Sequence, residues 1–166
     1  IESSADGSIL VITRWEDTML RSIDSGATWA TTATSQKWNG ITAAGSNMAA
    51  TVRNGNIWTS TDSGASWTEN TVSGTNNWRG IACSPDFTKQ AAVTYGGNIW
   101  ISTNSGASWT EKTSSGTKNW MNIGINADGT TLVAGANGGD LWKSMNSGTT
   151  WTAITTGETH GWRDIK

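Results

Sequence analysis

The stretch that decides the fold is Ser102-Thr103-Asn104-Ser105-Gly106-Ala107-Ser108-Trp109, because the chain repeats its pattern four times. The other copies occupy 22–29, 60–67 and 144–151, and all four read S-x-[DN]-x-G-x-x-W. In such a pattern Asp or Asn can accept hydrogen bonds from backbone amides ahead of it, and Gly supplies a positive φ without steric penalty. The pattern therefore predicts four copies of one turn, each joining two strands.

Tryptophans recur in three rows that keep step with this turn. The first row lies at intervals of 38, 42 and 42 residues, the second at 42 and 42, and the third at 40, 42 and 42. The rows are Trp29, Trp67, Trp109 and Trp151; Trp58, Trp100 and Trp142; and Trp38, Trp78, Trp120 and Trp162. A period near 42 residues with four β-rich segments per repeat is typical of the blades of a β-propeller.

Each repeat is expected to hold four short antiparallel strands. In the third and fourth repeats these are predicted at 78–83, 90–94, 98–102 and 108–113, and at 120–125, 132–136 and 140–144. Turn residues such as Gly96-Gly97 separate the second strand from the third. The first repeat diverges, because Leu20 replaces a row tryptophan and Trp15 stands in its loop between the second and third strands.

We expect one domain over residues 1–166. The repeats cover about 1–38, 39–78, 79–120 and 121–162, with 162–166 as a closing strand. Because Ile165 repeats the place of Ile1, the C-terminal segment is predicted to complete the blade that the N-terminus begins, which leaves no free sheet edge. Three arrangements stay open: a four-bladed ring within one chain, an eight-bladed ring of two chains joined head to tail, and a fragment of a longer propeller.

Composition limits the partners and the compartment. Charged residues make up 14% of the chain and the net charge is −2, so no basic surface is available for nucleic acid. No apolar run is long enough to insert in a membrane, and the one cysteine, Cys83, stands in no metal-binding cluster. The chain opens on Ile1 without a signal-peptide pattern, which suggests a processed, excised or engineered chain. Low charge with abundant Ser, Thr, Asn and Gly favours an extracellular, secreted protein.

The repeated string resembles the Asp-box, or BNR repeat, of sialidase-like β-propellers. Similar repeats occur in sialidases, sortilin-type receptors, xyloglucan-degrading enzymes and photosystem assembly factors, and the resemblance covers essentially the whole chain. It implies an all-β propeller of four-stranded antiparallel blades. It also implies that the turn is structural, because in those families the Asp-box lies away from the active site.

The resemblance gives each conserved position of the turn a structural role. The acid or amide caps the turn, the glycine permits its backbone, and the tryptophan packs into the blade. These residues are Asp24, Gly26 and Trp29; Asp62, Gly64 and Trp67; Asn104, Gly106 and Trp109; and Asn146, Gly148 and Trp151. Asn in two copies keeps the acceptor but removes the charge, which argues against a calcium site, and we expect neither metal nor cofactor.

A catalytic site of the sialidase type is not expected. Such a site would need an arginine cluster, a tyrosine activated by a glutamate, and an acidic general acid. The arginines do not recur at equivalent positions, and Tyr95 has no Glu beside it in the sequence. Other carboxylates are scattered and unpaired in the sequence: Glu16, Asp17, Glu69, Glu111, Glu158 and Asp164. We therefore expect a protein that is not an enzyme.

Candidate ligand residues stand in the loops opposite the repeated turn. Four of them occupy equivalent positions, one per repeat, in the loop between the second and third strands. The other three lie directly before a row tryptophan or one residue earlier. They are Trp15, Arg53, Tyr95 and Asn137, together with Asn77, Asn119 and His160. Aromatic faces beside amides and a cation suit a neutral sugar, so the first hypothesis is a lectin-like carbohydrate-binding module. The alternatives are a structural or protein–protein interaction propeller without a small-molecule site and, third, a glycosidase or sialidase-like enzyme.

Overall fold

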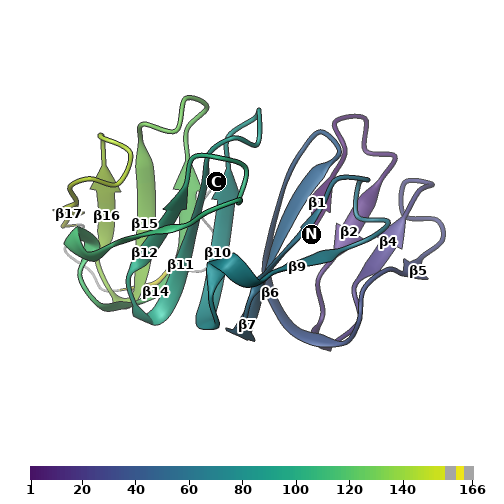
Figure 1. The fold of residues 1–166 in the computed structure, drawn as a ribbon, viewed down its shortest axis with the longest axis horizontal. Coiled ribbons are helices and arrows are strands. Elements are labelled where there is room, and N and C mark those ends of the chain that lie inside the picture. The colour runs from purple at the N-terminus through teal and green to yellow at the C-terminus, as the bar shows by residue number, and fades with distance from the viewer. Residues whose placement is uncertain (156–159, 163–166) are drawn as a thin grey trace.

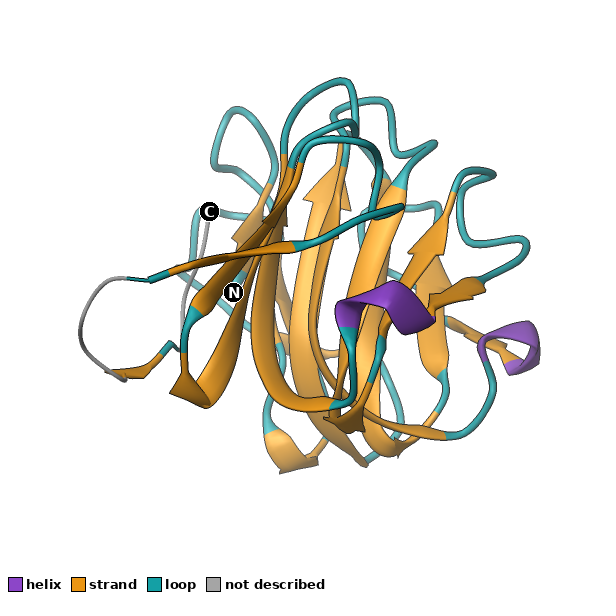
Figure 2. Ribbon diagram, turned by 90° about the vertical axis from the view of Figure 1, so that its left-hand side faces the viewer, coloured by secondary structure: helices purple, strands orange, loops and turns teal. Residues whose placement is uncertain are grey.

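A computed structural model describes residues 1–155 and 160–162 of the chain. In this part of the chain the regular structure consists of antiparallel strands and two short 3-10 helices, η1 (Thr71–Ser73) and η2 (Thr113–Ser115) (Figure 1). The strands run between two opposite ends of the molecule, and the turns collect at those ends (Figure 2).

The strands form four similar antiparallel units, each with four strands paired in chain order. Unit 1 holds β1 (Glu2–Ser3), β2 (Leu10–Ile12), β4 (Leu20–Ser22) and β5 (Ala30–Thr31). Unit 2 holds β6 (Gln36–Ala44), β7 (Asn47–Gly55), β8 (Ile57–Ser60) and β9 (Thr68–Asn70). Unit 3 holds β10 (Asn76–Cys83), β11 (Gln90–Gly97), β12 (Ile99–Ser102) and β13 (Thr110–Lys112). Unit 4 holds β14 (Lys118–Ile125), β15 (Leu132–Gly139), β16 (Leu141–Ser144) and β17 (Thr152–Ile154).

The first strand of a unit also joins it to the preceding unit. Asn77 at the start of β10 pairs with Arg53 of unit 2, and after a shift in register Ile81 pairs with Ala92 of its own unit. The same exchange links β6 to β3 (Trp15–Asp17), β14 to β11 and β18 (His160–Gly161) to β15. The first strands of units 2, 3 and 4 are thus each shared by two sheets, which ties neighbouring units together by backbone hydrogen bonds.

These shared pairings correct the predicted strand bounds. First strands begin two residues before the row tryptophan, and second strands run through the predicted glycine turns to Gly97 and Gly139. Trp15, predicted in a loop, lies in the short strand β3. Fourth strands are shorter than predicted, since β13 ends at Lys112.

In each unit, the passage of the chain from its own sheet to the next unit depends on one residue in the left-handed region of backbone conformation. Glu16, Asn54, Gly96 and Gly138 occupy equivalent positions with φ of 55°, 57°, 75° and 66°. Each lies at the register shift where the strand passes from its own unit to the next. A bulge of this kind leaves one residue unpaired and turns the strand, so the glycine pairs act as bulges and not as hairpin turns.

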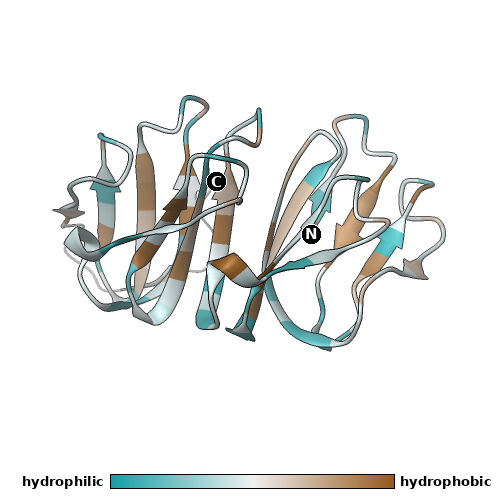
Figure 3. Cartoon of the chain, viewed as in Figure 1, coloured by the Kyte–Doolittle hydropathy of each residue, from teal (hydrophilic) through white to brown (hydrophobic). Residues whose placement is uncertain are grey.

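The core lies between neighbouring units, and the tryptophan rows fill it. Trp78 is fully buried and makes an edge contact with Trp100, with ring centroids 5.8 Å apart, and a tilted contact with Trp109 at 6.2 Å. The same trio recurs in units 2 and 4. Burying about 150–250 Å² of each indole stabilises the fold by several kcal/mol per tryptophan, at about 25 cal/mol per Å². The hydropathy colouring places the hydrophobic segments mainly in the strands (Figure 3).

First strands of neighbouring units approach one another closely. A Cβ at Gly80 would lie 2.8 Å from the Asn122 Cα, and a Cβ at Gly40 would lie 2.7 Å from the carbonyl oxygen of Arg79. Only glycine fits such contacts between two backbones. The approach leaves a narrow hollow, lined by residues 39–42, 80–83 and 121–125 together with Ile1, Glu2 and Thr13.

Units 1 and 4 lie at opposite ends of the row (Figure 1). Within residues 1–155 and 160–162, no strand pairing joins unit 1 to unit 4. The predicted closing strand, 162–166, lies outside the described residues except for Trp162. Ring closure and the final number of blades therefore stay predictions.

Candidate ligand-binding face

The repeated turns lie at one end of the strands, and each is held by hydrogen bonds among its own residues. In every copy the serine hydroxyl donates to Oδ1 of the Asp or Asn and accepts from the glycine N–H, at 2.7–3.0 Å. Oδ1 also accepts the N–H four residues ahead, at 2.8–2.9 Å. These bonds hold the pKa of Asp24 and of Asp62 at about 2, chiefly through the side-chain hydroxyls of Thr28 and Ser66. The turn thus uses its polar groups internally, as expected of a structural element.

The asparagine copies keep this geometry with one hydrogen bond reversed. Asp24 accepts from the Thr28 hydroxyl at 2.5 Å, whereas the Asn104 amide nitrogen donates to the Ser108 hydroxyl at 2.9 Å. A hydroxyl can take either role, so the turn tolerates both residues. The sequence did not reveal that the serine before each glycine also has a positive φ, of 54–57°. Among the described residues, no cluster of His, Cys, Asp or Glu could hold a metal ion.

The opposite end of the strands brings the predicted ligand residues together in pairs. Arg53 pairs with Asn77 and Tyr95 with Asn119 in the ladders between units, and Trp15 pairs with Lys37. Asn137 pairs with Gly161, next to His160, whose side chain lies outside the description. Asn119 and Asn137 are exposed, and Trp15 is 47% exposed. The predicted residues therefore follow one another along one face, one pair per joint between units.

Two arginines stack on two aromatic rings of this face, the exposed Trp15 and the half-buried Tyr95. Arg53 lies over the Trp15 ring, 5.4 Å from its centroid, and Arg79 lies over the Tyr95 ring at 4.9 Å. Arg79 was absent from the prediction. It directly follows Trp78, at a position that Asn39 and Met121 occupy in the neighbouring units. The variation at this position between units was the available signal. We call Trp15, Arg53, Arg79 and Tyr95 the arginine cluster.

Neither guanidinium group has an acidic partner among the described residues. The described ion pairs are Arg14 with Asp17, at 3.0 Å, and Lys37 with Glu16, at 3.5 Å. The Nε atoms of Arg53 and Arg79 and Oδ1 of Asn77 are buried without a hydrogen-bond partner in the described structure. Burial lowers the pKa of Arg79, and the positive charge of Arg53 lowers it further. A buried polar group without a partner destabilises the protein.

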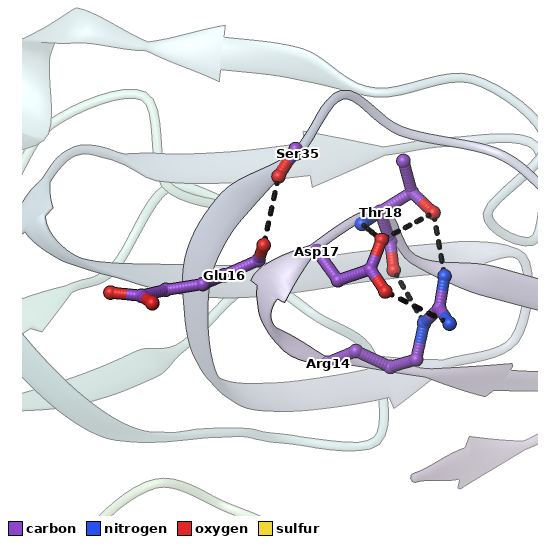
Figure 4. Close-up of polar contacts among 5 residues, drawn as sticks. All are labelled: Arg14, Glu16, Asp17, Thr18 and Ser35. Carbon is purple, nitrogen blue, oxygen red and sulfur yellow. Dashed lines mark hydrogen bonds and ion pairs between the residues drawn. The ribbon is translucent and has the colours of Figure 1, made fainter.

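Arg14 shows what a satisfied arginine looks like on the same face (Figure 4). Its Nε donates to the Thr18 carbonyl at 3.0 Å, and its Nη2 donates to the Thr18 hydroxyl at 2.8 Å. Asp17 completes the network and receives the Thr18 N–H at 2.6 Å. This network fixes the segment that presents Trp15. A shallow hollow beside it is lined by Glu16, residues 35–37 and residues 52–55, including Arg53.

Two described glutamates outside the turns are engaged as well. Glu69 and Glu111 each accept an amide N–H at 2.9 Å, from Asn56 and Asn98. Glu158 and Asp164 lie outside the described residues. Cys83 borders the narrow hollow beside the Thr42 hydroxyl, at 3.2 Å, and burial raises the pKa of its thiol. A thiol with a raised pKa is a poor nucleophile. The described residues include no helix with the length and hydropathy of a membrane span.

Comparisons with known proteins show the fold. No family model matches the sequence, and neither does any curated protein. An ancestral GH74 enzyme matches 92% of this chain over 23% of its own length, with TM-score 0.73 and 18% identity. YCF48 from Cyanidioschyzon merolae matches 95% of this chain over 56% of its own length, with TM-score 0.71 and 15% identity. A structure of YCF48 bound to D1 peptide matches 91% of this chain over 80% of its own length, with TM-score 0.58 and 14% identity.

These matches include an enzyme and a protein bound to a peptide, so they do not indicate one activity. The chain spans about a quarter of the GH74 enzyme and about half of the Cyanidioschyzon merolae protein. At such low identities the likeness concerns the backbone alone. Together with the four antiparallel units, it shows that this chain has a β-propeller fold.

Proposed function

We propose that this chain is a non-catalytic, extracellular binding module for carbohydrates that carry a carboxylate group, and that the arginine cluster is its ligand site. The observation that carries the proposal is the pair of guanidinium groups without an acidic partner among the described residues, each stacked on an aromatic ring. The sequence alone favoured a neutral sugar. The second arginine, Arg79, changes the expected ligand to an anionic one.

The cluster has the chemistry that an acidic sugar requires. A guanidinium group binds a carboxylate through two parallel N–H···O bonds, and it does so best where water is partly excluded. Arg53 and Arg79 are half-buried, which meets this condition. The exposed side of the Trp15 ring can pack against the C–H face of a sugar.

A protein partner is the second candidate. A protein of the same fold has been solved with a bound peptide, and a peptide carboxylate would suit the same arginines. A glycosidase is the third candidate, because enzymes occur among the structures with this fold. It would need two facing carboxylates, whereas Glu16 and Asp17 pair with Lys37 and Arg14.

A glycan array with neutral and carboxylated glycans tests the proposal. We expect wild-type protein to bind glycans with uronic or other acidic sugars, and the double variant Arg53→Gln with Arg79→Gln to lose this binding at least tenfold. Lys89→Gln is the matched control, because it removes one positive charge at the end of the strands that carries the repeated turns.

Three results would count against the proposal in different ways. Equal binding of neutral and acidic glycans would reject the role of the arginines. Binding of acidic peptides with no glycan signal would favour the protein partner. Release of sugar from a fluorogenic glycoside, lost on substitution of an acid, would favour the enzyme.

A further inference from the structure

The interfaces between successive units, which we call joints, show which residues cover each face of a unit. The trailing face of a unit is formed by its second and third strands, and the row tryptophan of the next unit packs on it. On unit 1 its residues Val11 and Met19 are completely buried, and so are Ala49 and Ile57 on unit 2. On unit 3 the equivalent residues are Ala91, Val93, Ile99 and Ile101, of which the most exposed reaches 6%. Three joints therefore bury the same positions in the same way.

In the part of the chain that the structure describes, the trailing face of unit 4 carries the same kind of surface and is less completely covered. Its equivalent residues include Val133 and Leu141, which pair within β15 and β16 as their counterparts do in unit 3. Both are only half-buried. The β15–β18 ladder and Trp162 lie at the edge of this face, and the Trp162 Nε1 donates to the Gly139 carbonyl at 2.9 Å.

The leading face of a unit is the opposite face, which packs on the trailing face of the preceding unit. On unit 1 this face is also incompletely covered. In units 3 and 4 the leading face includes Ile81 and Ile123, which are 5% and 1% exposed. The equivalent Ile1 is 64% exposed, and Trp29 is 37% exposed while the other turn tryptophans are half-buried. Unit 1 has Leu20 and Trp29 available for such a joint.

Each joint also adds a hydrogen bond that unit 1 lacks. The repeated turns of units 2, 3 and 4 accept side-chain donors from the preceding unit: the Thr32 hydroxyl on Gly64, the Asn70 amide on Gly106 at 2.6 Å and the Ser114 hydroxyl on Thr149 at 2.9 Å. Within the described residues, the Gly26 carbonyl of unit 1 accepts only the indole of its own Trp29, at 3.0 Å. Within residues 1–155 and 160–162, the Gly26 carbonyl thus lacks the second donor that the equivalent carbonyls of Gly64 and Gly106 receive.

We propose that the trailing face of unit 4 binds the leading face of unit 1 of a second copy, and that two such joints close a ring of eight units with twofold symmetry. Trp162 would fill the row position beside Leu20 and Trp29 of the partner subunit. A head-to-tail joint repeats an interface that the chain already makes three times, so no new complementarity is required. The ligand face would continue across the joint, with Asn137 next to Trp15 of the partner subunit.

Native mass spectrometry and light scattering across protein concentrations test this proposal on the full chain. The expected species has twice the 17.5 kDa chain mass and dissociates on dilution. A folded species of single-chain mass at all concentrations would overturn the proposal, because it would mean closure within one chain or an open row. Masses of three or more chains would overturn it as well.

Two variants locate the interface. Leu141→Glu places a charge in the centre of the trailing face, and we expect the dimer to weaken at least a hundredfold. Trp162→Ala removes a contact at the edge of the fold, so it should weaken the dimer at least tenfold while circular dichroism stays native. Met145→Glu is the matched control, because Met145 is 70% exposed on a repeated turn. Dimers unchanged by Trp162→Ala and by Leu141→Glu would reject this interface even if the mass were doubled.

Discussion

The two ends of the strands differ in how their polar groups are used. At the end with the repeated turns, four copies make the same hydrogen bonds, and Ser102 is completely buried with both partners in place. At the other end the equivalent positions hold Trp15, Arg53, Tyr95 and Asn137, and buried donors are left without partners. The serine-centred bonds of the repeated turns therefore build the fold, although Trp109 Nε1 and Gln90 Oε1 at that end are also buried without a partner. The positions that vary between units lie at the other end, where we propose that a ligand binds.

The largest expected effect belongs to the regular end. Ser102→Ala removes the hydroxyl that joins the Gly106 N–H to Asn104, so a buried amide loses its partner. We expect the free energy of unfolding to fall by about 1–3 kcal/mol, measured by urea denaturation. Thr103→Ala is the control, because Thr103 is exposed in the same turn and makes no described hydrogen bond. Equal effects of the two substitutions would mean that the turn network does not stabilise the fold.

Substitution at the irregular end should leave stability nearly unchanged and alter ligand response. Arg79→Gln loses a cation–π contact of about 0.5–1 kcal/mol but also removes a like charge beside Arg53. We expect stability within about 0.5 kcal/mol of wild type. Glucuronate at five times its dissociation constant should stabilise the wild type by about 1 kcal/mol, and the variant much less. Thermal denaturation with glucuronate and with uncharged glucose separates the two contributions. Equal stabilisation of wild type and variant by glucuronate would remove Arg79 from the site.

The same division explains how much the sequence could predict. The turns and tryptophan rows were predictable because their chemistry is local and recurs about every 42 residues. The bulge at Glu16 was not, since a glutamate with φ of 55° carries no local signal. Nor was the approach of Arg79 to Arg53, which depends on the ladder between β7 and β10. Residues brought together by pairing between units lie beyond local patterns.

The acid and amide copies of the turn should differ in their response to acid. The pKa of Asp24 and Asp62 is about 2 in the fold, below the ordinary value near 3.8. Their stabilising contribution is therefore complete above about pH 4 and is lost as the pH falls towards 2. We expect the double variant Asp24→Asn with Asp62→Asn to lose less stability than wild type between pH 4 and 2, measured by urea denaturation. Asp6, Asp86 and Asp128, whose pKa values are also lowered, keep part of the acid response. Identical pH profiles of wild type and variant would show that these two carboxylates gain nothing from the turn.

The smallest effect is expected when an asparagine copy of the turn is changed into an aspartate copy. Asn104→Asp keeps the Oδ1 acceptor for the Ser102 hydroxyl and the Ser108 N–H, and the Ser108 hydroxyl can rotate to donate as Ser66 does to Asp62. At pH 7 the free energy of unfolding should change by no more than about 0.5 kcal/mol. The variant should also gain an acid-sensitive contribution that the Asn104 turn lacks. A loss as large as that of Ser102→Ala would show that unit 3 requires the amide donor, and that the four turns are not interchangeable.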